Sequence, residues 1–435
     1  MKKNLKIFYW NEFNIQDKEK ILSRPILHNL TVLQDQVKKI ILDVKMLGDK
    51  ALYNYTHVFD KIRLNQIKVS KSSILNSELH IEKTVKHAIK TSFENIKRFH
   101  SLQSVKDIDL KVNKDIFCQQ IIRPIKSVGL YVPGGSAPLV STVLMLVVPA
   151  MVSGCKKIVL CSPPPISQEI LYASKICGIQ EIFQIGGAQA IAALGCGTNT
   201  IPKVDKIFGP GNAFVTEAKR QVSQMFYNVG IDMLAGPSEV LIIADKNANF
   251  EFIASDLLSQ MEHDNYSQAI LVTYDQRLAK NVLNEISKQI KSLPRYKIIM
   301  QALKNSKIII TQDLYQCFEV SNLYAPEHLM IQCEHAQDFL KYVISAGSIF
   351  LGNWSPVAVG DYAIGTNHVL PTYGSANVYS GLSLIDFQKR ISVQKLNQKG
   401  LKDISSTVLS LSTVEQLDAH KNSVKIRLSL PSNEI

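Results

Sequence analysis

The chain has 435 residues, 46% of them apolar, and its 49 basic and 37 acidic side chains give a net charge of +12. A chain of this length and composition is expected to fold around a substantial core in two or more domains, which excludes wholesale disorder and low-complexity or coiled-coil architectures. The basic residues are interleaved with acidic and polar ones, so the charge favours a solvated surface over nucleic-acid binding, the alternative that it raises.

No membrane span and no disulfide framework are expected. The longest apolar stretch, residues 143–152, is about half the ~20 residues that a span requires, and polar residues from Asn11 onward leave no secretory signal. The seven cysteines are widely spaced and form no Cys-x-x-Cys pair, which indicates reduced thiols. The expected compartment is the cytoplasm.

The N-terminal quarter is predicted to be mostly helical. Apolar residues recur with the 3.6-residue period from Val32 to Leu47 and stop at Gly48. A second run with this period extends from Ile81 to Phe99 and carries lysine and glutamate on its other face. Both patterns are typical of amphipathic helices.

After Pro124 the pattern changes to short β-branched runs that end in glycine or proline and precede helix-like stretches. The sequence predicts strands at 128–132, 157–161, 181–185 and 204–208. This alternation is typical of a parallel sheet, which binds ligands at the carboxyl ends of its strands.

The alternation resumes after Gly236, and past Phe387 the chain becomes rich in lysine, serine and glutamine. The predicted elements are strands at 240–244, 269–274 and 307–311, helices at 250–263 and 276–290, and a last helix around 414–419. We therefore predict an α/β fold with two Rossmann-like parallel-sheet modules and small N-terminal and C-terminal helical segments. The predicted units are an N-terminal segment (1–25), a discontinuous α/β domain with the metal and catalytic residues (26–129 and 239–383), a second α/β domain on the nucleotide side (130–238) and a tail domain (384–435).

Three glycine-rich turns follow predicted strands, at Pro133-Gly134-Gly135, Gly186-Gly187 and Gly209-Pro210-Gly211. Backbone N–H groups in such turns, with the positive end of the next helix, can bind phosphate or ribose. Residues 209–214 keep only two glycines of the Gly-x-Gly-x-x-Gly fingerprint, so an ordinary tight turn is the alternative. Three such turns in one module favour a nucleotide site.

Gln260 and His263 lie three residues apart at the end of a predicted helix and hence on one face. Such a pair, taken alone, is more often hydrogen-bonded at a surface than bound to a metal. Oxygen and nitrogen donors from elsewhere could complete a site for zinc, or for manganese, without thiolates. The candidate donors are Asp361, His368 and His420.

Glu327 and His328 place a carboxylate beside an imidazole, and Pro326 is expected to hold Ala325 in an extended conformation. Histidine is the usual general base at neutral pH, and glutamate can activate water. In a regular strand the two side chains would face opposite sides, so a common target requires a bend. The alternative is a solvated pair at the end of a strand.

These segments resemble the histidinol dehydrogenase family over essentially the whole chain. The most specific parts are Gly209-Pro210-Gly211-Asn212, Gly236-Pro237-Ser238-Glu239, and residues 260–264, 325–329 and 360–372. Met261 and Ser423 stand where the family more often has alanine, at positions without a functional role. The resemblance implies a zinc-dependent four-electron oxidation of L-histidinol through L-histidinaldehyde to L-histidine with two NAD molecules, the last steps of L-histidine biosynthesis.

The resemblance also implies the roles of single residues. It gives the zinc ligands, which also contact the substrate, as Gln260, His263, Asp361 and His420. Further substrate contacts would come from Ser238, His328, His368 and Glu415, and NAD contacts from Tyr131, Gln189 and Asn212. The family forms an obligate homodimer in which the tail of one subunit supplies Glu415 and His420 to the site of the other.

The implied chemistry suits these residue types. A neutral His328 would take the hydroxyl proton as hydride leaves, and Glu327 would deprotonate the water that hydrates the aldehyde. Zinc would mainly position the amino and imidazole nitrogens of the substrate.

Two other enzymatic interpretations are open. Cys118 or Cys155 could form a thiohemiacetal with an aldehyde, although neither lies beside a histidine or in a polar motif. A zinc hydrolase in which Glu327 activates metal-bound water would need no NAD. Reduction of NAD on addition of histidinol distinguishes the dehydrogenase from the hydrolase.

Overall fold

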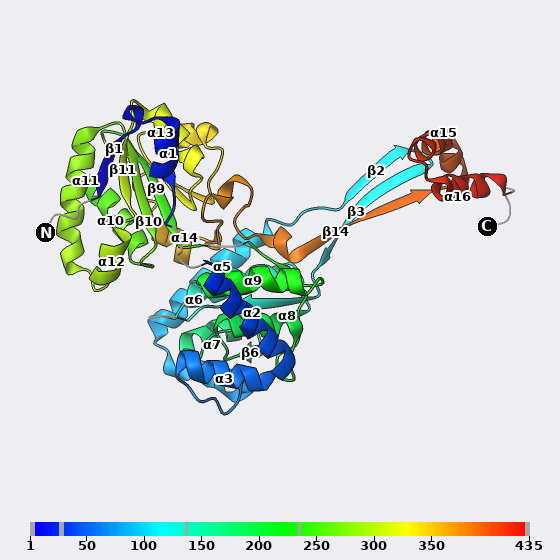
Figure 1. Ribbon diagram of the computed structural model, residues 1–435, viewed down its shortest axis with the longest axis horizontal. Coiled ribbons are helices and arrows are strands. Elements are labelled where there is room, and N and C mark those ends of the chain that lie inside the picture. Colours follow the sequence, from blue (N-terminus) through cyan, green and yellow to red (C-terminus); the bar gives the residue numbers. More distant parts are fainter. Residues whose placement is uncertain (1–4, 26–29, 135–137, 234–235, 431–435) are drawn as a thin grey trace.

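The computed structural model describes residues 5–25, 30–134, 138–233 and 236–430. Two bodies are each built on a parallel sheet, and a long arm stands out from them (Figure 1). The predicted α/β fold with two parallel-sheet modules is confirmed. Within the described ranges no helix is long and apolar enough to cross a membrane.

Sheet A, the centre of the first body, has six parallel strands in the order β1-β11-β10-β9-β12-β13. The chain builds outward from β9 in one direction and then returns to place β12 on the other side of β9, so the strand order reverses between these two strands. The strands are β1 (Lys6–Tyr9), β9 (Glu239–Ala244), β10 (Gln268–Thr273), β11 (Lys307–Ile310), β12 (His328–Gln332) and β13 (Ser348–Leu351).

Helices cover both faces of sheet A, and we call this body module A (Figure 1). The strands are apolar almost throughout because both of their faces are buried. One face packs against α10 (Phe250–Met261), α11 (Gln276–Gln289), α12 (Tyr296–Ala302) and α14 (Val357–Tyr362), and the other against α1 (Ile15–Leu22) and α13 (Leu314–Tyr324).

Sheet B has five parallel strands in the order β6-β5-β4-β7-β8 and forms the centre of module B. Its order reverses between β4 and β7. The strands are β4 (Ser127–Tyr131), β5 (Lys157–Cys161), β6 (Glu181–Phe183), β7 (Lys206–Phe208) and β8 (Gly230–Ile231).

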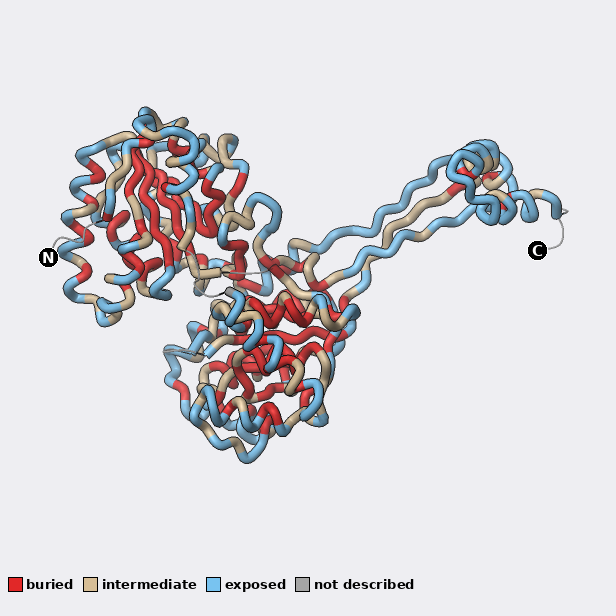
Figure 2. Tube along the Cα trace, viewed as in Figure 1, coloured by how far each residue is buried: buried red, intermediate tan, exposed pale blue. Residues whose placement is uncertain are grey.

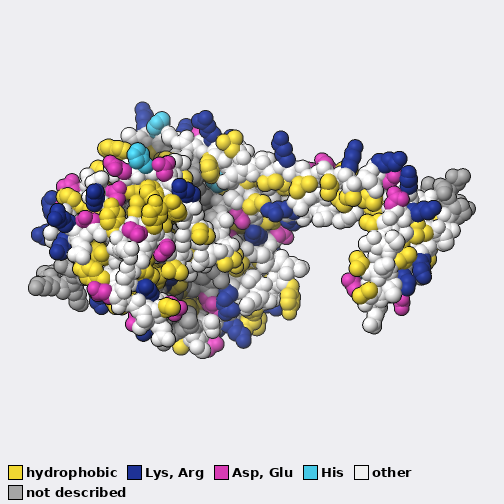
Figure 3. All heavy atoms as spheres, turned by 90° about the horizontal axis from the view of Figure 1, so that it is seen from above, with side chains coloured by type: hydrophobic (Ala, Val, Ile, Leu, Met, Phe, Trp, Pro, Cys, Tyr) yellow, Lys and Arg dark blue, Asp and Glu magenta, His cyan; other side chains and the backbone are white. Residues whose placement is uncertain are grey.

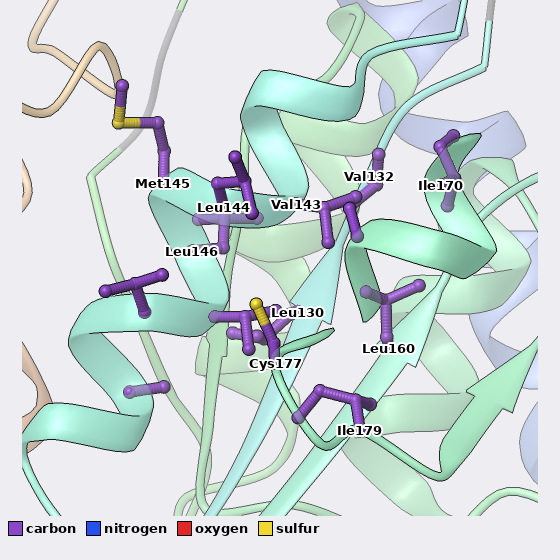
Figure 4. Packing of buried hydrophobic residues seen from close by; sticks show 14 of the residues in the cluster. Leu130, Val132, Val143, Leu144, Met145, Leu146, Leu160, Ile170, Cys177 and Ile179 are labelled. Carbon is purple, nitrogen blue, oxygen red and sulfur yellow. The ribbon is translucent and has the colours of Figure 1, made fainter. Parts of the chain in front are cut away.

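The helices within residues 30–101 pack on sheet B and not on sheet A, which differs from the predicted grouping of residues 26–129 with 239–383. Their apolar faces complete the two cores of module B, one of which is shown in Figure 4. One face of the sheet carries α4 (Lys71–Asn76), α5 (Lys83–Ser101), α6 (Val140–Val152) and α7 (Gln168–Ile176); the other carries α2 (Leu30–Leu47), α3 (Asp49–Asp60), α8 (Gly187–Cys196) and α9 (Ala213–Met225).

The arm is an antiparallel sheet that ends in a helical pair, and most of it is exposed (Figure 2). Its strands lie in the order β14-β3-β2, and two helices form its tip. The elements are β2 (Ile108–Asn113), β3 (Ile116–Pro124), β14 (Gln388–Leu396), α15 (Gln398–Val414) and α16 (Asp418–Ser429). The helix predicted around 414–419 is not a single helix, because Val414 ends α15, residues 415–417 form a turn, and α16 begins at Asp418.

Candidate active site between the modules

The candidate catalytic residues lie at the amino edge of sheet A. Glu239 is the first residue of β9 and His328 is the first residue of β12, the strand paired with it. This position differs from the expected carboxyl edge, where ligands of open α/β sheets usually bind.

The backbone of Glu239 holds both members of the Glu327–His328 pair. Its N–H donates to Glu327 Oε2 at 2.7 Å, and its carbonyl oxygen lies 3.0 Å from His328 Nδ1. Because a carbonyl can only accept, Nδ1 carries the proton of this bond, which leaves Nε2 as the basic nitrogen of the neutral ring. Nε2 lies 4.0 Å from Asp361 Oδ1, and both His328 and Glu327 are buried.

The charges around His328 favour its protonated form. Burial lowers the pKa of His328, but the carboxylate of Glu327 and, less strongly, that of Asp361 outweigh it and raise the pKa to about 9. In the isolated chain these carboxylates thus favour the protonated imidazole, whereas the sequence led us to expect a neutral one. A cation bound at Asp361 would remove part of this effect.

Glu239 is anchored in turn by Arg24, a residue of the N-terminal segment. Arg24 Nη2 lies 2.9 Å from Glu239 Oε2, and the guanidinium carbon lies 3.9 Å from the centre of the Tyr324 ring. The Tyr373 N–H also donates to the Glu239 carboxylate. Burial raises the pKa of Glu239 although Arg24 opposes it. The start of β9 is thus fixed by a buried ion pair.

Ala325 is not extended as predicted, since its φ of 50° and ψ of 69° place it in the left-handed region. Its N–H bonds to the Ser321 carbonyl at 2.8 Å and ends α13, so termination of the helix overrides the influence of Pro326. The bend that a common target for Glu327 and His328 requires is therefore present just before β12.

Three of the four proposed metal ligands come from the ends of two helices that return to the same edge. Gln260 lies in the last turn of α10, and His263 follows it, with its N–H 3.4 Å from the Gln260 carbonyl. Asp361 lies near the end of α14, which shares a core cluster with α10 through Val357. Gln260 Nε2 is buried and has no hydrogen-bond partner within the described residues, so this amide is available to a ligand.

The segment after α14 connects the site to module B. Asn95 of α5 donates to the Ala363 carbonyl at 2.8 Å, and Asn367 donates to the Met145 carbonyl of α6 at 2.8 Å. His368 follows directly, and its Nε2 is buried without a partner in the described part of the chain. Burial lowers the pKa of His368 although the nearby Asp361 raises it. Ser238, just before β9, is half-buried, and its carbonyl accepts from the N–H of Gln268 at 3.1 Å.

The residues proposed to contact NAD lie at the carboxyl edge of sheet B, beside its order reversal. Tyr131 ends β4, and its buried hydroxyl accepts from the Gly187 N–H at 3.0 Å. A Cβ on Gly209, whose φ is 125°, would lie 2.1 Å from the Tyr131 carbonyl oxygen, so only glycine allows this approach. Gln189 Oε1 is buried and has no partner among the described residues.

The 209–212 turn leads into α9 and rests on a second buried ion pair. The Asn212 side chain accepts from the N–H groups of Phe214 and Val215 at 3.1 and 3.2 Å and caps the helix. Beneath it the Gly209 N–H donates to Asp232 Oδ2 at 2.8 Å, and Lys219 pairs with Asp232 while donating to the Gly209 carbonyl at 2.9 Å. The comparable turn after β4 includes Gly135, which lies outside the described residues.

Glu415 and His420 lie apart from all these residues, at the tip of the arm (Figure 1). Both are exposed. The two candidate nucleophilic cysteines are also elsewhere: Cys118 lies in β3 of the arm, and Cys155 bonds to Ser153 at 3.3 Å. Burial raises the pKa of Cys155, which does not favour a thiolate.

Sequence reasoning missed the supporting residues of both sites. Glu239 ends the Gly-Pro-Ser-Glu motif directly before the strand predicted at 240–244. Its role could not be predicted, because it depends on contacts with residues far away in the chain. Arg24, Lys219 and Asp232 carry no local signal, because each acts only through a partner that the fold supplies.

The fold and the site together define the class of an α/β enzyme. A candidate acid–base pair lies at sheet A, and glycine-rich turns of the kind that bind nucleotides lie at the carboxyl edge of sheet B. The sequence profile of the histidinol dehydrogenase family matches residues 25–428. The chain is 60% identical to histidinol dehydrogenase of Buchnera aphidicola subsp. Baizongia pistaciae, over 97% of each chain, and 51% identical to that of Escherichia coli O6:H1, over 97% of this chain and 98% of the relative.

A solved structure also matches this chain closely. The chain matches the crystal structure of histidinol dehydrogenase from Elizabethkingia anophelis with a TM-score of 0.93 and 43% identity, over 98% of each chain. The chain belongs to the histidinol dehydrogenase family and is thus an oxidoreductase.

Proposed function

We propose that this enzyme oxidises L-histidinol to L-histidine through L-histidinaldehyde, with two NAD molecules and a zinc ion, in the last steps of histidine biosynthesis. The observation that carries the proposal is the buried Glu327–His328 pair, held by the Glu239 backbone beside Asp361. It lies in a chain related to histidinol dehydrogenases along nearly its whole length.

The residues present fit a zinc ion of the proposed kind. Gln260, His263 and Asp361 offer oxygen and nitrogen donors at one edge, and a fourth would be His420 of a second copy. No three His, Cys, Asp or Glu residues of the described single chain surround a common point, so the proposed ligand set depends on a glutamine and on a residue from another chain. When bound, zinc would hold the amino and imidazole nitrogens of histidinol and so orient its carbinol carbon.

NAD would accept the electrons at the carboxyl edge of sheet B. The positive amino ends of α8 and α9 suit the phosphates of the nucleotide, and the unpaired Gln189 Oε1 can accept a hydrogen bond from its hydroxyl or amide groups.

His328 is the proposed base for both oxidations. Its Nδ1–H bond to the Glu239 carbonyl directs Nε2 toward Asp361 and hence toward the proposed substrate. A neutral His328 takes the hydroxyl proton of the alcohol in the first step and of the aldehyde hydrate in the second.

Glu327 is the proposed base for hydration of the aldehyde. Its Oε2 lies 3.4 Å from His328 Nδ1 and accepts from the Glu239 N–H, so one oxygen is fixed and the carboxylate keeps acceptor capacity for a water. A buried carboxylate beside the base can take the water proton and place the attacking oxygen.

We also propose a homodimer in which the tip of each arm enters the site of the other copy. The arm exposes Ile108, Leu110 and Val112 on β2 and Ile391 on β14, each more than 40% accessible in the single chain. Figure 3 shows hydrophobic side chains in a row along the arm. An extended apolar surface of this kind favours burial against another chain.

The central experiment measures NADH formed per histidinol consumed by the zinc-loaded enzyme. Two NADH support the proposal, and one would mean that the second oxidation is missing. No reduction of NAD with zinc present would favour the hydrolase. Full oxidation without added NAD would contradict the role of the nucleotide.

A mixing experiment tests the shared site. His328→Asn and His420→Asn chains are each expected to be inactive, but a hybrid dimer has one site with both histidines intact. After subunit exchange an equal mixture should regain about a quarter of wild-type activity, because half of the dimers are hybrids with one working site. No recovery in a mixture shown to contain hybrids would place both histidines in the same site of one chain.

A further inference from the structure

A cavity of about 390 Å³ opens at the carboxyl edge of sheet A, away from the catalytic residues at the amino edge. Its walls include the residues that follow β9, β12 and β13. The strand order of sheet A reverses between β9 and β12, and the crevice at such a reversal is where open α/β sheets usually bind ligands. The volume lies within the ~300–1,000 Å³ typical of small-molecule sites.

The walls of the cavity do not suit an anion. None of the described residues that line it is lysine or arginine, and the β9–α10 turn that borders it, residues 245–249, contains no glycine that would let backbone N–H groups approach a phosphate. Two carboxylates, Asp245 and Glu334, line it instead. Asp245 is held by the N–H groups of Asn247 and Glu334, both at 2.9 Å.

The wall of the cavity contains a buried amide oxygen that lacks a hydrogen-bond donor among the described residues. Gln332, the last residue of β12, is 1% exposed, and its Oε1 has no hydrogen-bond partner within the described residues. Leaving a buried amide oxygen unpaired costs about 1–3 kcal/mol, so a ligand with N–H groups would be stabilised here.

An exposed aromatic ring completes the wall. Trp354 lines the cavity with 87% of its surface accessible, and its closest ring neighbour is Phe252, with centroids 5.9 Å apart. An indole face attracts cations, most strongly among aromatic side chains. The other tryptophan, Trp10, is buried, so Trp354 provides a separate optical signal.

We propose that this cavity binds a small organic ammonium ion. Its N–H groups would donate to Gln332 Oε1 and to the Glu334 carboxylate, and its charge would lie near the Trp354 ring. An organic cation is favoured over a metal ion because no three His, Cys, Asp or Glu residues of the described chain come together there, although His335 and Cys333 also line the cavity. This binding is independent of the proposed oxidation of histidinol.

The test titrates the full-length, zinc-loaded enzyme with 1,4-diaminobutane at constant ionic strength and follows tryptophan emission, with calorimetry in parallel. The uncharged 1,4-butanediol and potassium chloride are the matched controls. We expect a saturable change with the diamine alone. Glu334→Gln should raise its Kd at least threefold, and Gln332→Leu likewise. Glu319→Gln, an exposed carboxylate on α13, should leave it unchanged.

Trp354→Phe should abolish the optical change while calorimetry still detects binding. Butanediol binding as well as the diamine, or a Kd unchanged in both Glu334→Gln and Gln332→Leu, would each overturn the proposal. Loss of histidinol oxidation in these variants is not expected, because the cavity lies at the opposite end of the strands.

Discussion

Module A and module B share one architecture, a parallel sheet between helical layers, but their candidate functional residues lie at opposite edges. In module B these residues follow the strands, at Tyr131, Gly187 and the 209–212 turn. In module A they begin the strands, at Glu239 and His328, or end the helices that return to that edge.

This difference gives the two edges opposite polarity. The carboxyl edge of sheet B presents the amino ends of α8 and α9, where the positive end of the helix dipole favours an anion. The amino edge of sheet A receives the carboxyl end of α10, where free carbonyls and the negative end favour a cation. The same fold thus suits a nucleotide phosphate at one edge and a metal ion at the other.

Each edge is also supported by one buried ion pair, Arg24–Glu239 in module A and Lys219–Asp232 in module B. The first fixes the strand start that holds the proposed catalytic pair, Glu327 and His328, and the second fixes the 209–212 turn. We therefore expect that disrupting the two pairs affects different kinetic constants.

The largest effect is expected from His328→Asn, which removes the proposed base. Its kcat should fall by about 10³-fold or more, within the range for loss of general-base catalysis. Zinc content and the KM for NAD should stay close to those of the wild type. His80→Asn, an exposed histidine on module B, is the control, and comparable activity in the two variants would remove His328 from the mechanism.

Lys219→Met should impair module B. It leaves Asp232 buried without its partner, which typically costs about 3–5 kcal/mol of unfolding free energy. Urea denaturation would measure this loss, and steady-state kinetics should show a higher KM for NAD with little change in kcat at saturating NAD. Lys219→Met/Asp232→Asn should recover part of the stability, and no recovery would contradict the unpaired-charge explanation.

Arg24→Met should act on the other edge. Freeing the Glu239 anchor is expected to shift the catalytic pair and lower kcat by ~10–100-fold, the usual cost of a misplacement of about 1 Å. The KM for NAD should not change, in contrast to Lys219→Met. Arg24→Lys should restore part of kcat, and a rise in the NAD KM as large as that of Lys219→Met would mean that the two edges are not separable.

The smallest effect concerns Asp256, a buried residue of α10 one turn before Gln260. Burial raises its pKa to about 7, above the usual ~3.9 of an unfolded chain. A raised folded pKa means that stability is fully present below about pH 4 and is lost as the pH rises toward 7. Asp256→Asn should therefore gain about 1–3 kcal/mol at pH 8 and almost nothing at pH 4.

Unfolding by urea at both pH values measures this difference. Asp338→Asn, an exposed carboxylate of the same module, is the control and should show no gain at either pH. An equal gain for Asp256→Asn at pH 4 and pH 8 would show that the cause is not ionisation.

Much of both sheets was predictable because their strands are short apolar runs between glycine or proline turns. The strand predicted at 157–161 is β5, and the helix predicted at 276–290 is α11 to within one residue. The arm was missed although β2 alternates between apolar and polar residues, since its apolar side chains face solvent in the single chain and β14 pairs with a segment more than 260 residues earlier.

Part of the candidate site could also be predicted from the sequence. Local motifs indicated Glu327, His328, Gln260 and His263, because their chemistry is visible in adjacent residues. The roles of Glu239 and Arg24 could not be read from the sequence, since a buried ion pair between residues 215 positions apart exists only once the fold brings them together. The same holds for the assignment of helices α2 to α5 to module B.

The base of the arm contacts β7, the strand that precedes the 209–212 turn. The central strand of the arm, β3, runs almost directly into β4, and Phe387, just before β14, stacks on Phe208 of β7 with ring centroids 4.1 Å apart. Lys206 of β7 also donates to the Asp386 carbonyl at 2.8 Å. The base of the arm therefore contacts β7 directly ahead of Gly209, so the arm that is proposed to reach a second copy is anchored next to the turn that is proposed to bind the nucleotide.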